Sequence, residues 1–106
     1  MTDVAHGTLT TSVQTIVSAV SSTDRRVVTH ATFFNTHSSE VTVTVYYMRS
    51  GETTVSPGVN KGSKTIPPSQ AWLCPNLLGQ EISTGGFIQS VATVNSVIDY
   101  NITVED

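Results

Sequence analysis

Serine, histidine and aspartate, the side chains of a hydrolytic triad, all occur in this chain, so nucleophilic catalysis is the first chemistry to consider. The nucleophile elbow Gly-x-Ser-x-Gly is absent from the sequence. His6 lies near the N-terminus, His30 within an alternating apolar segment and His37 in a short polar linker. A general base must lie within hydrogen-bond reach of its nucleophile, and this scattered placement does not favour such a contact. We therefore expect that the protein is not an enzyme.

Metal, thiol and phosphate chemistry lack a motif as well. The histidines have no ligand-like spacing and the acidic residues are dispersed, although a calcium site assembled from distant acids stays open. Cys74, the single cysteine, is expected to be a small buried hydrophobe, because a reactive thiol needs an electropositive neighbour. Gly85-Gly86 lacks the Gly-Lys-Ser of a phosphate loop and is expected to form a turn with positive φ. We expect no cofactor and no metal.

Other residues are suited to contact with a partner protein. Tyr46 falls on the Thr42, Thr44 and Met48 face of an alternating segment, and tyrosine is enriched at interfaces. The basic pairs Arg25–Arg26 and Lys61/Lys64 could dock onto an acidic protein surface. Trp72, the single tryptophan, could fill a core or an interface. The candidate interface residues are Arg25, Arg26, Tyr46, Lys61, Lys64 and Trp72.

Composition limits the classes of fold and partner. The chain has 106 residues, 38% hydrophobic and only 12% charged, against about 25% charged in a typical domain. Threonine, serine and valine are abundant, which favours strands over helices. The formal net charge of −3 and a pI near 5.4 disfavour a nucleic-acid partner. No apolar run approaches the ~20 residues that span a bilayer, so no membrane partner is expected.

Strict alternation positions these residues on strands. Val41–Met48 places valines on one face and threonines on the other, and Arg26–Asn35 also resembles a strand. Because the linker 36–40 is short and polar, these two strands are predicted to form an antiparallel hairpin. Further strands are expected within residues 8–20, 64–66, 70–74, 87–93 and 97–104.

The remaining segments complete a single domain over residues 1–106. Residues 1–7 are predicted to be an extended N-terminal arm. Residues 49–63 are rich in glycine and proline and are expected to be an exposed loop, with one weak strand at 52–56, that orders on binding a partner. A helical turn or a tight loop at 76–79 would place Leu77 or Leu78 in the core. Seven or eight short strands without a helix predict an antiparallel β-sandwich, Ig-like or jelly-roll-like.

The order of these segments resembles that of small β-sandwich virion proteins of tailed bacteriophages. The resemblance covers about residues 8–104. It rests on FFNT leading into VTVTVY, on IPPSQAWLCPNLLG and on GGFIQSVAT. The chain departs from that pattern at residues 67–70, where the family commonly has Ala-Gly-Glu, and at Asn76, where an acid is common.

The resemblance implies a structural part of a virion, assembled in the host cytoplasm, and the N-terminus carries no basic or apolar export signal. We expect a capsid cement or decoration protein that binds the major capsid protein as a homo-oligomer, a dimer or a trimer. A neck or tail component is the alternative within the same class. A carbohydrate-binding module, with Tyr46, Tyr47 and Trp72 as its platform, is an alternative from another class.

Overall fold

Alternating valine and threonine give strand β4 (Val41–Met48) one face for a core and one for solvent. Val41, Val43 and Val45 are buried, whereas the threonines between them are only half-buried. The structure, a computed structural model, describes residues 2–18, 26–82 and 85–105. Within these ranges nine strands form two antiparallel sheets, and there is no helix. The predicted all-β sandwich is therefore confirmed, with nine strands where seven or eight were expected.

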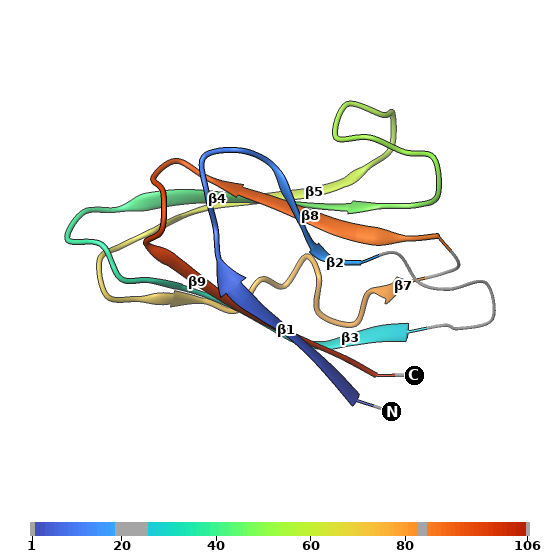
Figure 1. Ribbon diagram of the computed structural model, residues 1–106, viewed down its shortest axis with the longest axis horizontal. Helices are drawn as coiled ribbons and strands as arrows, with labels where there is room; N and C mark the ends of the chain where they lie inside the picture. The colour runs from blue at the N-terminus through green and yellow to red at the C-terminus, as the bar shows by residue number, and fades with distance from the viewer. Residues whose placement is uncertain (1, 19–25, 83–84, 106) are drawn as a thin grey trace.

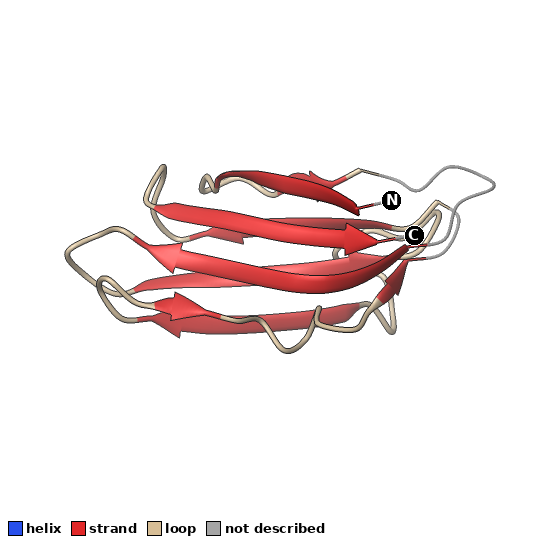
Figure 2. Ribbon diagram, turned by 90° about the horizontal axis from the view of Figure 1, so that it is seen from below, coloured by secondary structure: helices blue, strands red, loops and turns tan. Residues whose placement is uncertain are grey.

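The strands form two layers, a five-stranded sheet and a four-stranded sheet (Figures 1 and 2). Sheet A has the order β1–β9–β3–β6, and β7 also pairs with β3. Its strands are β1 (Thr2–Thr8), β3 (Arg26–Asn35), β6 (Ala71–Trp72), β7 (Glu81–Ile82) and β9 (Ile98–Glu105). Sheet B has the order β2–β8–β4–β5. Its strands are β2 (Gln14–Val17), β4, β5 (Asn60–Ile66) and β8 (Phe87–Ala92).

This strand order is that of a jelly roll. The antiparallel pairs β1 with β9, β2 with β8, β3 with β6 and β7, and β4 with β5 belong to one long hairpin. Rolling that hairpin up brings β9 beside β3 and β8 beside β4. In an Ig-like sandwich the first strand lies beside the second, but here β1 lies beside β9. Of the two sandwich types left open by the sequence, the jelly roll is the one observed.

The core lies between the sheets and is filled by apolar side chains from both. β3 interrupts its own alternation, since Val28 and Ala31 are both buried although they are three positions apart. A register shift between Val28 and His30 explains this, because a β-bulge adds one residue and restores the inward face. Leu77, as predicted, is fully buried in the turn after β6, and Leu78 is exposed.

The predicted hairpin of residues 26–35 and 41–48 is wrong, although both strands have the bounds expected for them. β3 lies in sheet A and β4 in sheet B, so the linker 36–40 crosses between the layers. Alternation determines which side chains face the core but not which strand is the neighbour. A β3–β4 hairpin and a β3–β4 crossing would bury the same side chains. The alternation of apolar residues therefore could not distinguish the two arrangements.

Two predicted segments are also corrected. Residues 2–7 are not a separate arm, because β1 pairs with β9 over its whole length, and Met1 lies outside the described residues. Gly7 lies opposite Tyr100 in that pairing, and a Cβ at Gly7 would lie 2.9 Å from the Tyr100 hydroxyl oxygen. The exposed loop predicted at 49–63 ends at residue 59, before β5 begins at Asn60, and residues 52–56 do not form the expected strand.

Asn35, at the end of β3, is a buried polar residue that joins the two sheets. Its Nδ2 donates to the carbonyl oxygens of Ile66, Ser39 and Pro67 at 2.9, 3.0 and 3.3 Å. Its Oδ1 accepts from the His37 backbone N–H at 2.8 Å. The same side chain therefore holds the β3–β4 crossing at 36–40 against the β5–β6 crossing that follows Ile66.

We predict that Asn35→Asp destabilises the fold more than Asn35→Ala does. Alanine leaves the carbonyl oxygens that Asn35 contacts without their donor, at a cost of about 1–3 kcal/mol. Aspartate adds a carboxylate facing three carbonyl oxygens, which costs ~3 kcal/mol or more and should lower the urea midpoint furthest. Asn101→Asp, on the exposed face of β9, is the matched control and should change stability by less than ~0.5 kcal/mol. Equal midpoints for the two aspartate variants would contradict the role of Asn35.

Candidate binding surfaces

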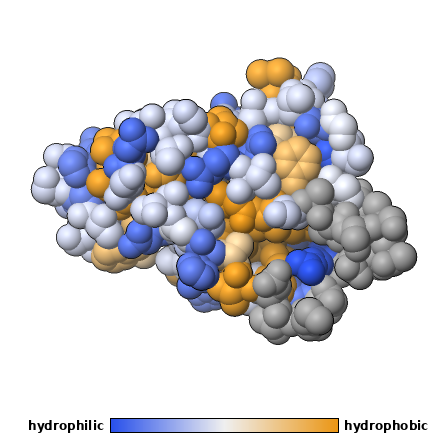
Figure 3. Space-filling view, viewed as in Figure 1, coloured by the Kyte–Doolittle hydropathy of each residue, from blue (hydrophilic) through white to orange (hydrophobic). Residues whose placement is uncertain are grey.

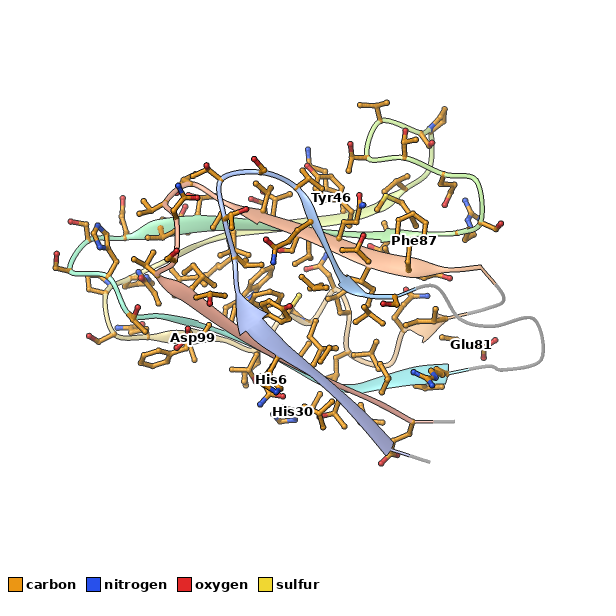
Figure 4. All side chains as sticks on the ribbon, viewed as in Figure 1. His6, His30, Tyr46, Glu81, Phe87 and Asp99 are labelled. Atoms are coloured by element: carbon orange, nitrogen blue, oxygen red, sulfur yellow. The ribbon has the colours of Figure 1, made fainter. Side chains whose placement is uncertain are left out.

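Tyr46 and Lys61 are the two predicted interface residues that the fold brings into contact. They lie opposite each other on β4 and β5, and Lys61 Nζ is 5.8 Å from the centroid of the Tyr46 ring. A cation at this distance is attracted by the ring, an interaction worth about 0.5–1 kcal/mol at an exposed site. Tyr46 belongs to the outer face of sheet B, on the side away from the core (Figure 4), and Lys61 shares that face because it pairs with Tyr46.

The other predicted interface residues are dispersed. Lys64 lies three positions from Lys61 on β5 and therefore points to the opposite face of the strand. Trp72 is half-buried and packs on Phe33, with ring centroids 5.7 Å apart and planes at 35°. Arg26 is half-buried at the start of β3, where it pairs with Ile82 of β7. Arg25 lies outside the described residues.

Strand geometry also separates the three aromatic residues that were expected to form a sugar-binding platform. Tyr46 and Tyr47 are adjacent on β4, so their rings point to opposite faces, and Tyr47 is buried on the core side. Trp72 belongs to the other sheet and faces Phe33. These three aromatic residues therefore form no common surface, and a carbohydrate platform built from them is wrong.

The loop after β4 is held by its own hydrogen bonds. Arg49 donates from Nε and Nη2 to the two Glu52 carboxylate oxygens at 3.1 and 2.9 Å, and its backbone N–H donates to Glu52 at 2.7 Å. The side-chain hydrogen bond from Arg49 lowers the pKa of Glu52, and the same bond raises the pKa of Arg49. A hollow of about 330 Å³ lies beside this pair, lined by residues of β4, β5, β7 and the loop. The charged groups of Arg49 and Glu52 satisfy each other, so they are not available to a ligand in this hollow.

The side chains that most often ligate metals are dispersed in the described ranges. There, no three His, Cys, Asp or Glu side chains lie close enough to hold a metal ion. Asp24, one of the dispersed acids, falls outside those ranges. His6 and His30 point outward from sheet A, and His37 lies in the crossing after β3 (Figure 4). Cys74 is fully buried, and this burial raises the pKa of its thiol to about 11.

A groove of about 450 Å³ runs across the outer face of sheet A, where the sequence indicated no site. Strand pairing arranges its side chains in two rows. One row is His6, Asn101 and Thr32, and the other is Thr8, Asp99 and Phe34. Each row takes one residue from β1, one from β9 and one from β3. The backbone of Gly7 and Tyr100 completes the lining.

The polar side chains of this groove are not engaged within the protein. In the described part of the chain, the side chains of His6, Thr32, Asp99 and Asn101 form no hydrogen bond. Phe34 is 40% exposed beside them. A ring with unoccupied donors and acceptors on its flank is the usual composition of a small-molecule site.

Sequence reasoning missed this groove for a physical reason. Its three strands are distant in sequence and adjacent only after the chain has rolled up. One local signal was present: Phe33 and Phe34 are neighbours on a strand, so one of the two rings must point away from the core. Phe33 is fully buried and Phe34 is the ring that points outward.

Comparison with known proteins identifies no relative of this chain. No family model, curated protein or solved structure matches it. Among the described residues there is no helix with the length and apolar character needed to cross a membrane.

We predict that the Cys74 thiol is unreactive in the folded protein. A pKa of about 11, against 9.0 for an ordinary cysteine, lowers the thiolate fraction at pH 8 about a hundredfold. The native protein should therefore react with iodoacetamide far more slowly than the urea-unfolded protein, measured by mass spectrometry. Because the unfolded thiol ionises first, stability should fall as pH rises from about 9 to 11. Cys74→Ala should remove that part of the pH dependence, and equal labelling rates of both states would contradict the prediction.

Proposed function

We propose that this protein is a structural component of a bacteriophage particle, a capsid cement or decoration protein that binds the major capsid protein. Its resemblance to small virion proteins of tailed phages supports the particle class. The jelly-roll strand order agrees with it, because this fold recurs in viral capsid domains as well as in lectins and cupins. The same fold hosts all of these functions, so the surfaces of the sandwich distinguish among them.

The interior of the sandwich is unsuited to a ligand. Among the described residues, the buried polar side chains are Asn35 and Ser90. Asn35 is engaged at the crossings, and Ser90 Oγ donates to the Thr44 carbonyl oxygen at 2.8 Å. The other buried side chains of the described core are apolar or aromatic, or belong to Cys74. A protein of this kind acts through its outer faces and edges, which favours binding to other molecules over chemistry inside the fold.

The observation that carries the proposal is the Tyr46–Lys61 contact on the outer face of sheet B. The surrounding side chains are hydroxyls that pair with each other: Thr42 with Thr65 at 2.8 Å, and Thr44 with Ser63 at 3.2 Å. Among the described residues of β4, β5 and β8, Lys61 is the one charged side chain on this face. An aromatic anchor beside a cation, on a surface with few unmet hydrogen bonds, suits contact with an acidic protein surface.

The edges of the sheets indicate how copies could associate. β5 carries Lys61, Gly62 and Lys64, β2 is short and contains a register shift, and β6 and β7 have two residues each. Such features protect a sheet edge from pairing with another chain. β1 is a regular seven-residue edge strand without lysine, arginine or proline. Figure 3 shows hydrophobic side chains gathered between β1 and β2. We propose that a second copy pairs with β1, so that the protein is a dimer.

The docking proposal predicts that Tyr46→Ala combined with Lys61→Glu lowers the occupancy of phage heads at least tenfold. The double variant removes the anchor and reverses its charge without touching the core. Occupancy is measured by gradient sedimentation of particles and mass spectrometry against the major capsid protein. Lys64→Glu, the same charge change on the opposite face of β5, is the matched control and should bind normally.

Wild-type copy number tests the proposal as a whole. Hundreds of copies per particle support a cement protein, and a dozen or fewer indicate a neck or tail component. Absence from particles would contradict the virion proposal. Equal occupancy of the double variant and the wild type would contradict the docking face.

The edge proposal predicts that Val4→Lys weakens self-association at least tenfold in analytical ultracentrifugation, because it places a cation on the edge strand of both copies. Val4 is 47% exposed, so the monomer should keep its thermal midpoint. Val55→Lys, at an 88% exposed position in the loop after β4, is the same change away from the edge and should associate as the wild type does. A wild type that stays monomeric at all concentrations would contradict pairing through β1.

A further inference from the structure

We propose that the groove on the outer face of sheet A binds a neutral sugar ring, such as one unit of a cell-surface glycan. The groove is formed by β1, β9 and β3. This inference is independent of the docking role of sheet B, because the two surfaces lie on opposite sides of the sandwich (Figure 4).

Phe34 provides the apolar part of this site. Its ring is 40% exposed in the middle of a sheet surface, where an apolar side chain gains from being covered. The face of an aromatic ring carries partial negative charge and attracts the polarised C–H groups on one side of a sugar. Asp99 lies directly opposite Phe34 on β9, about 5 Å away between Cβ atoms. A sugar stacked on Phe34 would therefore bring its hydroxyls to Asp99.

The polar side chains around Phe34 match the hydroxyls of a sugar. A sugar hydroxyl donates one hydrogen bond and accepts others, so a binding site needs both kinds of partner. Asp99 accepts, whereas Asn101 and Thr32 can both donate and accept, as can a neutral His6. Within the described residues these side chains have no competing hydrogen bond to break. Asp99 and Asn101 lie two residues apart on one face of β9, about 7 Å, so one ligand can reach both.

The charge and volume of the groove disfavour other ligands. No lysine or arginine lines it, and Asp99 would repel a phosphate or a sulfated sugar. Its volume of about 450 Å³ lies within the ~300–1,000 Å³ range of small-molecule sites. An extended peptide would need free backbone groups at a sheet edge, but the central strand β9 is paired on both sides. A small amine could also contact Asp99 and Phe34, and this alternative is an outcome of the test.

The test is an NMR titration of the full chain with methyl glycosides of glucose, galactose, mannose and N-acetylglucosamine. We expect at least one glycoside to shift the amide signals of residues 32–34 and 99–101, with an affinity of about millimolar, typical of one shallow site. Phe34→Ala and Asp99→Asn should each weaken that binding at least tenfold. Leu73→Ala, at an apolar residue 64% exposed elsewhere, and Glu105→Gln, on the same strand outside the groove, are the matched controls and should bind as the wild type does.

Several outcomes would overturn the inference. Saturation with all four glycosides without a shift in the groove would do so, and so would shifts confined to the Tyr46 side of the sandwich. A response to choline or methylamine with none to the glycosides would assign the groove to cations. Unchanged amide spectra of the variants outside the groove show that they remain folded. Since the titration uses isolated protein, its result does not depend on whether the chain binds phage heads.

Discussion

The buried amide of Asn35 is the interaction on which the arrangement of the two sheets depends. A jelly roll requires the chain to pass repeatedly from one sheet to the other, and each crossing has backbone groups that no strand pairs. Asn35 satisfies carbonyl oxygens of two such crossings at once, with Nδ2 directed at Ile66, Ser39 and Pro67. The backbone of Asn35 adds bonds from its own N–H to Gln70 and from Ser69 to its carbonyl. The end of β3 is thereby fixed relative to β4, β5 and β6. The relative position of the two sheets depends on these contacts.

Much of this fold could be predicted from local patterns, and the pairing of strands could not. The bounds of β3 and β4, the inward face of β9, the buried Leu77 and the buried Cys74 follow from alternation and turn chemistry within a few residues. The neighbour of each strand depends on contacts across the whole chain, and for this reason the hairpin expected between β3 and β4 proved to be a crossing. The expectation of an extended N-terminal arm fails for the same reason. Its partner β9 lies at the far end of the sequence.

The candidate residues follow the same rule. Tyr46 and Lys61 meet because β5 begins at Asn60 and pairs with β4. The sequence pattern assigns Lys61 to the exposed loop 49–63, so it does not report this contact. Trp72 is expected to fill a core or an interface, and its two-residue strand lies beside Phe33, on which its ring packs. The groove of sheet A combines β1, β3 and β9, and no local signal reports that combination.

The two outer faces differ in how far their polar groups are already satisfied, and this difference supports separate roles for them. On sheet B the hydroxyls pair across strands, and Gln89 donates to Thr15 at 3.2 Å, so a partner loses little by covering that face. On sheet A the polar side chains of the groove have no such partners among the described residues, so a ligand that supplies hydrogen bonds gains by binding there. β1 lines this groove and is also the terminal strand of sheet A. A second copy paired along β1 would therefore place two grooves on one continuous sheet, and two weak sites held together bind a repeating glycan more tightly than either alone.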